Sequence, residues 1–151
     1  MKKAIALLLA LVMVFALCAC GGGGDSAGGD KVVKIGVFEP ASGDSGAGGK
    51  KEMLGMQYAN QETPTVEIGG ETYKVELVYS DNGSDSAKAV SAASKLVNEK
   101  VSLVLGSYGS GVSIAASDTF KQAGIPAIGV TCTNPNVTAG NSHYFRICFL
   151  D

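Results

Sequence analysis

The sequence contains one histidine and no tryptophan, and only 17% of its 151 residues are charged. The histidine, His143, lies in the polar segment NSHY with no metal-ligand spacing around it, so we expect a surface loop residue and no metal site. The loops offer no Ser-His-Asp set, no Cys-His pair and no facing carboxylates. We therefore predict a chain that is not an enzyme and needs no cofactor.

The first nineteen residues, MKKAIALLLALVMVFALCA, form an export leader by composition. Two lysines precede about fifteen apolar residues, fewer than the roughly 20 that a spanning helix needs. Residues 17–20, LCAC, resemble the lipobox of bacterial lipoproteins, which implies cleavage after residue 19 and lipid attachment at Cys20; an ordinary secretory leader is the alternative. Residues 20–31 are rich in glycine and are predicted to form a flexible tether, spanning on the order of 17 Å.

Removal of the leader leaves 10 basic and 14 acidic residues, a net charge of −4. Nucleic acid is therefore not expected as a partner. Two cysteines remain, Cys132 and Cys148. Export permits a disulfide between them, but free buried thiols are favoured because pairing requires a geometry that the sequence does not supply.

The glycine-rich stretch GDSGAGGKKE, residues 43–52, is similar in composition to a phosphate-binding loop but lacks the residues that define one. The pattern G-x-x-x-x-G-K-[ST] needs a glycine five positions before Gly49 and a hydroxyl after Lys50, where the chain has Asp44 and Lys51. The dinucleotide fingerprint also fails, because Lys51 stands where the third glycine must pack. We expect no nucleotide site here, and we favour solvated lysines.

From Lys31 onward, short β-branched runs alternate with helical stretches of small residues, which is typical of a parallel sheet. Single strands are expected at residues 32–38, 102–105, 126–130 and 144–149. A hairpin is expected over 66–80 with its turn at Gly69-Gly70. This order requires right-handed crossovers and predicts an α/β fold, a doubly wound parallel sheet with helices on both faces.

Three helices are expected between these strands. The first has its core at 53–61, the second follows a cap at Ser84 or Asp85, and the third ends at Gly124. The second is predicted to face the sheet with Val90, Ala93, Leu96 and Val97. The third is predicted to face it with Val112, Ala115, Ala116, Thr119, Phe120 and Ala123.

Ligands of such sheets bind beyond the carboxyl ends of the strands, and the loops expected there are rich in Gly, Ser, Thr and Asn. These loops belong to four segments: KIGVFEPASGDSGAGGKKEMLGMQYA, VELVYSDNGSDSAKAVSAASKLVNEKVSLVLGSYGSGVSIAAS, AGIPAIGVTCTNPNVT and YFRICFLD. In order and spacing they resemble the N-terminal lobe of the extracytoplasmic solute-binding proteins of ABC importers, in the leucine/isoleucine/valine-binding branch. The resemblance runs from about Lys34 to the last residue.

The resemblance implies a periplasmic-binding-protein-like I fold, with residues 32–151 as the N-terminal lobe. It implies capture of amino acids, branched-chain or similar small zwitterions, for the membrane subunits of an ABC importer. The chain would be lipid-anchored to the outer face of the bacterial cytoplasmic membrane, or periplasmic. A ligand-sensing module of an extracellular receptor system and an exported enzyme on a flavodoxin-like sheet are the alternatives.

In that family, the loop after the third strand offers a serine hydroxyl and backbone N–H groups to the ligand carboxylate, which Ser110 matches. Ser110 and Gly111 open a helix whose first N–H groups have no intrahelical partner. The next loop supplies a carbonyl and a threonine, and Tyr108 would supply an aromatic ring near Gly48. The predicted ligand-binding residues are Tyr108, Gly109, Ser110, Gly111, Thr131, Cys132 and Thr133. Ser110 as a simple N-cap and Thr133 as a simple turn former remain open.

The end of the sequence, RICFLD, resembles the first passage towards a second lobe, which we expect to be absent from this chain. The acidic residue that pairs with the ligand ammonium in relatives would lie in that other half. Two hydrogen bonds to a carboxylate contribute roughly 3 to 6 kcal/mol, whereas association costs on the order of 4 kcal/mol or more. We therefore expect the chain alone to bind amino acids no better than millimolar.

Overall fold

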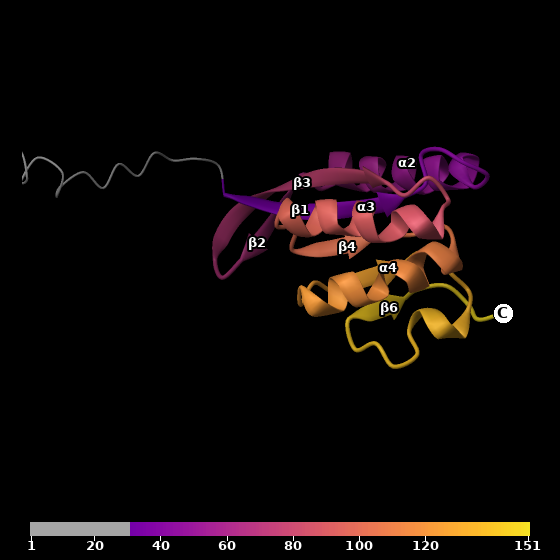
Figure 1. The fold of residues 1–151 in the computed structure, drawn as a ribbon. Helices are drawn as coiled ribbons and strands as arrows, with labels where there is room; N and C mark the ends of the chain where they lie inside the picture. Colours follow the sequence, from indigo (N-terminus) through magenta and orange to yellow (C-terminus); the bar gives the residue numbers. More distant parts are fainter. Residues whose placement is uncertain (1–30) are drawn as a thin grey trace, which may run out of the picture.

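A computed structural model describes residues 31–151 (Figure 1). The predicted leader, the lipid attachment at Cys20 and the predicted tether up to residue 30 lie outside the described residues. The strands are β1 (Val32–Glu39), β2 (Thr65–Ile68), β3 (Glu71–Asp81), β4 (Leu103–Leu105), β5 (Ala127–Gly129) and β6 (Tyr144–Arg146). The helices are α2 (Gly46–Glu62), α3 (Ser86–Asn98), α4 (Ser110–Gln122) and the short 3-10 helix η1 (Pro135–Val137).

The strands form one sheet in the order β2-β3-β1-β4-β5-β6. All neighbours pair in parallel except β2, which pairs antiparallel with β3. The predicted α/β fold is thus confirmed, with the predicted hairpin as its antiparallel edge. Gly69 and Gly70 make the hairpin turn with positive φ values of 61° and 81°, a conformation that glycine adopts without a steric penalty.

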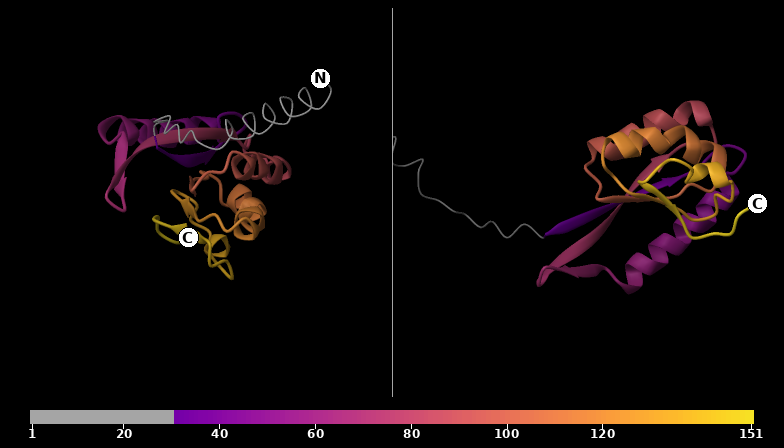
Figure 2. Two further views of the ribbon diagram at one scale, coloured as in Figure 1. Left: turned by 90° about the vertical axis from the view of Figure 1, so that its left-hand side faces the viewer. Right: turned by 90° about the horizontal axis from the view of Figure 1, so that it is seen from below.

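Helices cover both faces of the sheet (Figure 2). Helix α2 lies on one face, and α3 and α4 lie side by side on the other. The core lies under α3 and α4, where Phe38 of β1 meets the ring of Phe120 edge to face with centroids 5.5 Å apart. Leu96 and Val104 are buried in the same cluster.

The predicted face of α4 is correct at its centre, since Val112, Ala116 and Phe120 are buried, whereas Ala123 is exposed at the helix end. In α3 the prediction was wrong at Val90, which is 50% exposed. Its buried residues are Ala89, Ala92, Ala93 and Leu96. Four alanines and three serines among the 13 residues of this helix leave its apolar pattern ambiguous, and packing buried Ala89 and Ala92 in place of Val90.

Asp85, one of the two predicted caps, begins α3 by accepting a hydrogen bond from the Ala87 N–H at 2.8 Å. Helix α2 begins at Gly46, well before the predicted core at 53–61, so most of the glycine-rich stretch is helical. A Cβ at Gly49 would lie 2.2 Å from the Pro40 carbonyl oxygen. Glycine here therefore lets the start of α2 pack closely on the chain that leaves β1.

We expect Gly55→Ala to raise the free energy of unfolding by about 0.5 to 1 kcal/mol, because alanine loses less entropy in a helix. Gly55 lies inside α2, and a Cβ there would meet no atom within 4 Å. Urea unfolding measures the change. As the opposite control, Gly124→Ala should lower stability by about 1 kcal/mol, since Gly124 has a φ of +68° after α4. Destabilisation by Gly55→Ala would contradict this description of α2.

Candidate functional site

The parallel strands bring four loops together at the carboxyl edge of the sheet, residues 40–45, 82–85, 106–109 and 130–134. The carboxylate of Asp81 joins the first two loops. It accepts hydrogen bonds from the Ala41 N–H (2.8 Å), the Ser42 hydroxyl (2.7 Å) and the Gly83 N–H (2.8 Å). Partial burial raises the pKa of Asp81, but these hydrogen bonds outweigh it, so the pKa lies below its ordinary value.

The third loop lies tightly against the end of β1. A Cβ at Gly106 would lie 2.3 Å from the Phe38 carbonyl oxygen, and its φ of +117° also requires glycine. The side-chain amide of Asn82 donates to the Ser107 hydroxyl at 3.0 Å, and both residues are buried. The start of α4 is thereby held next to the first two loops.

Four of the seven predicted ligand residues border two neighbouring hollows, whereas Ser110, Cys132 and Thr133 border neither. Tyr108 and Thr131 border a hollow of about 580 Å³. Gly109 and Gly111 border a smaller one of about 170 Å³. Ser45 lines both hollows, so they are adjacent.

Ser110 is the first residue of α4 and Gly109 is the N-cap, so the alternative that Ser110 is an N-cap was wrong. The Ser110 Oγ accepts a hydrogen bond from the Asn134 N–H at 3.2 Å and so joins the third loop to the fourth. An accepting hydroxyl keeps its own proton available for donation. Ser110 therefore retains the chemistry that a carboxylate ligand requires.

The remaining predicted residues, Cys132 and Thr133, make contacts within the fold. The Cys132 side chain is fully buried, and burial raises the pKa of its thiol. Both Cys132 and Cys148 are free thiols, as the sequence favoured, but only Cys132 is buried and Cys148 is half-buried. The Thr133 carbonyl accepts hydrogen bonds from the Arg146 guanidinium (3.2 Å) and the Asp151 N–H (3.2 Å). Neither residue borders the two hollows.

Tyr108 lies where the sequence suggested an aromatic ring. A Cβ at Gly48 would come within 2.5 Å of the Tyr108 ring, so the ring lies directly against the first turn of α2. The side chain is 42% exposed. The ring therefore forms part of the wall of the larger hollow and remains open to solvent.

Sequence reasoning missed two residues of this edge, Glu39 and Glu52. Glu39 ends β1 and is 1% exposed, and Glu52 projects from α2 into the larger hollow. Glu39 accepts a hydrogen bond from the Tyr108 N–H at 2.8 Å, and Glu52 accepts one from the Thr131 hydroxyl. Because the two carboxyl groups also contact each other, the expectation of no facing carboxylates was wrong. A charged residue inside the buried run GVFEP was the available signal.

Burial raises the pKa of Glu39 to about 10, and the hydrogen bond and negative charge of Glu52 act in the same direction. The Tyr108 N–H opposes this shift because it favours the ionised form. Glu39 is therefore a protonated carboxylic acid at neutral pH.

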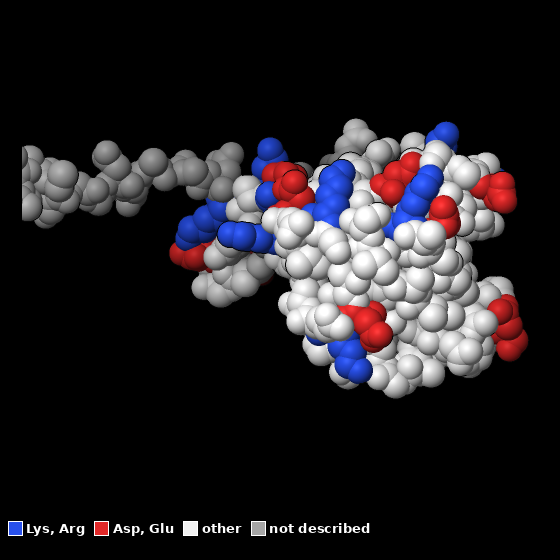
Figure 3. Space-filling model, viewed as in Figure 1, with Lys and Arg blue, Asp and Glu red and all other residues white. Residues whose placement is uncertain are grey.

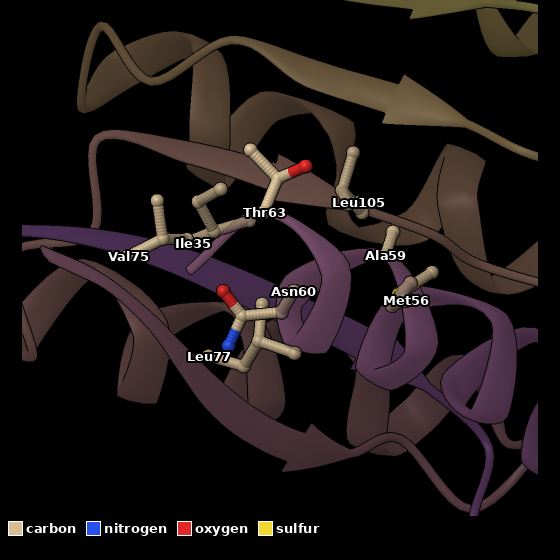
Figure 4. A pocket seen from close by; sticks show the side chains of 8 residues that line it. All are labelled: Ile35, Met56, Ala59, Asn60, Thr63, Val75, Leu77 and Leu105. Atoms are coloured by element: carbon tan, nitrogen blue, oxygen red, sulfur yellow. The ribbon is translucent and has the colours of Figure 1, made fainter. Parts of the chain in front are cut away.

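A different cavity, of about 210 Å³, lies between α2 and the sheet (Figure 4). Its walls are mostly apolar, with Ile35, Leu77 and Leu105 from the strands and Met56 from the helix. Asn60 and Thr63 are its polar side chains, and none of the residues that line it is charged. We therefore place the candidate site at the loops and not in this cavity.

Charged side chains of both signs are interspersed over the upper part of the surface in Figure 3, and the surface around α4 is mostly uncharged. Within residues 31–151, no three or more His, Cys, Asp or Glu side chains gather as metal ligands would. In the same part of the chain, every helix is too short or too polar to cross a bilayer.

Comparison with known proteins gives the family. The model of the periplasmic binding protein family matches residues 32–148. The Leu/Ile/Val-binding protein homolog 2 of Brucella abortus is 32% identical over 120 residues, which are 79% of this chain and 32% of that relative. The chain thus spans about a third of the length of the curated relatives it matches.

Two solved structures agree. The leucine-binding protein LivK of Thermotoga maritima superposes with a TM-score of 0.73 at 36% identity, over 80% of this chain and 33% of that one. LivJ of Streptococcus pneumoniae, a branched-chain amino acid transporter substrate-binding protein in complex with isoleucine, gives 0.71 at 33% identity, over 80% and 34%. The resemblance inferred from the sequence motifs is confirmed.

We expect Glu39→Gln to become more stabilising relative to the unchanged chain as pH rises from about 5 to 9. The folded chain holds a proton on Glu39 that the unfolded chain releases above its ordinary pKa of 4.5, so this group destabilises the fold increasingly with pH. Glutamine carries no such proton equilibrium and can still accept from the Tyr108 N–H. The difference should grow by up to about 1.4 kcal/mol per pH unit.

Urea unfolding at several pH values measures this difference. Glu62→Gln, at the exposed end of α2, is the matched control and should leave the pH profile unchanged. Parallel profiles for Glu39→Gln and the unchanged chain would show that Glu39 ionises normally in the fold.

Proposed function

The chain belongs to the periplasmic binding protein family, and from this membership we propose that it captures an amino acid outside the cytoplasm for an ABC importer. The ligand class is a branched-chain amino acid or a similar small zwitterion. The names of the relatives support this class, since they bind leucine, isoleucine or valine. The proposal contains no catalytic step.

The observation that carries the proposal is the open start of α4 beside an aromatic wall. The N–H groups of the first turn of a 13-residue helix have no intrahelical partner and favour an anion. Gly109 and Gly111 leave these groups without a covering Cβ, and Ser110 keeps a hydroxyl proton to donate. A carboxylate would bind there, and Tyr108 would contact the aliphatic part of the ligand.

The proposed organisation of the chain follows its sequence. Residues 1–19 would be removed as an export leader, residues 20–31 would be a tether lipid-anchored through Cys20, and residues 32–151 would form the N-terminal lobe. Its partners would be the membrane subunits of the importer. A second lobe would supply the group that pairs with the ligand ammonium.

We expect L-leucine to bind this chain with a dissociation constant in the millimolar range, because one lobe supplies only part of the contacts. Titration to 20 mM, followed by amide chemical shifts, should move the resonances of residues 108–111. Ser110→Ala should weaken binding several-fold, while Ser91→Ala, on the exposed face of α3, should not. Absence of any shift would contradict the proposed function, and micromolar binding would contradict the expectation that a second lobe supplies part of the contacts.

A second test concerns the Tyr108 ring. Gly48→Ala would displace the ring, because the new Cβ would lie within 2.5 Å of it, and L-leucine binding should weaken several-fold. Gly55→Ala makes the same substitution in the same helix with no atom nearby, so leucine affinity should not change. Equal affinity of the two variants would exclude Tyr108 from the binding surface.

A further inference from the structure

Two carboxyl groups from different elements meet beneath the proposed ligand site. Each uses one oxygen to hold a loop: Glu39 Oε2 accepts the Tyr108 N–H at 2.8 Å, and Glu52 Oε1 accepts the Thr131 hydroxyl. The other oxygens, Glu39 Oε1 and Glu52 Oε2, are buried and have no hydrogen-bond partner among the described residues.

Two buried oxygens without a donor require an explanation, because a buried polar atom without a partner is costly. The two carboxyl groups lie within hydrogen-bonding contact of each other. One proton between them would give each oxygen a partner and leave a single negative charge on the pair. Two ionised carboxylates in contact would instead repel each other strongly.

We propose that Glu39 and Glu52 share one proton and act together as positioning residues, holding Tyr108 and Thr131 in place for ligand binding. The ligand part of this inference rests on the proposed function. The shared proton does not, and it can be tested without any ligand.

The groups around the pair favour a shared proton over a counter-ion. Two ion pairs form within the described part of the chain, Lys31–Glu71 and Lys34–Glu99. Neither of them includes Glu39 or Glu52. Lys51 of α2 borders the larger hollow, but it is exposed. Asp44, in the loop before α2, adds a further acidic group to the lining of the same hollow.

The other strands bring no cation to the pair. At the end of β3, the Asp81 carboxylate accepts hydrogen bonds from three donors in the first two loops. From β6, the Tyr144 hydroxyl donates to the Gly106 carbonyl at 2.8 Å, and burial raises the pKa of Tyr144, so it stays neutral. Cys132 beside it is a buried thiol, and its pKa is also raised. The neighbourhood therefore stabilises a protonated acid more than a second carboxylate.

At alkaline pH, Glu39 and Glu52 are expected to lose the proton that they share. Loss of the shared proton places two negative charges in contact, and the carboxyl groups separate. Glu39 is fixed at the end of a central strand, so the movement falls on Glu52 and on the loops that the pair holds. Tyr108 and Thr131 then lose their common support.

The first experiment follows the two carboxyl groups directly by NMR of the chain with ¹³C-labelled glutamate side chains, assigned through Glu39→Gln and Glu52→Gln. We expect the pair to lose one proton in the ordinary acid range and the second above neutral pH. The amide resonances of Tyr108 and Thr131 should move with the second step. That step should vanish in Glu39→Gln, move to lower pH in Glu52→Gln, where burial alone still acts on Glu39, and persist unchanged in the control Glu62→Gln.

Complete ionisation of both groups below pH 6 would overturn the shared proton. Failure of Tyr108 and Thr131 to follow the second step would overturn the positioning role. The unchanged chain alone gives both readouts, so the result holds even if a variant does not fold.

The second experiment uses L-leucine as the probe across the same pH range. Leucine affinity of the unchanged chain and of Glu62→Gln should fall several-fold above the second step, whereas that of Glu39→Gln should stay constant. The same pH dependence in Glu39→Gln would overturn the link to the ligand. Absence of leucine binding in the unchanged chain would overturn that link together with the proposed function, and the carboxyl titration would still decide the shared proton by itself.

Discussion

Parallel pairing of β1 with β3 on one side and β4 on the other is the constraint on which the candidate site depends. The register places Glu39 of β1 opposite Asp81 of β3, so these two strands end at the same level. Their following loops then meet within hydrogen-bonding distance, and the loop after β4 joins them through Gly106. A site at this edge follows from the direction of the strands more than from any single side chain.

This arrangement buries an unusual set of polar groups at one edge. Asn82, Ser107, Ser113 and Glu39 all lie among the buried residues, and the first three satisfy one another or nearby backbone groups. Such a network fixes the loops before a ligand arrives, which lowers the ordering cost of binding. Glu39 and Glu52 extend the same network through the proton that they share, which lets one carboxyl group donate a hydrogen bond to the other.

Much of the fold was predictable because its signals are local. The β-branched run of β1, the Gly69-Gly70 turn and the cap at Asp85 each depend on a few adjacent residues. The face of α3 and the start of α2 were not predictable in the same way. Alanine and glycine carry little apolar pattern, so packing against neighbouring elements determined which residues became buried and where the helix began.

The sequence by itself determined the alternation of strands and helices and the family, and it predicted the loops at which a ligand would bind. Only the tertiary structure decided which of those loop residues face a hollow, and that Glu39 and Glu52 meet there with Tyr108 and Thr131. Thr131 and Glu52 are 79 positions apart, and no local spacing encodes their contact. The physical reason is that periodicity and turn chemistry act over a few residues, whereas a carboxyl pair forms where separately folded elements pack together.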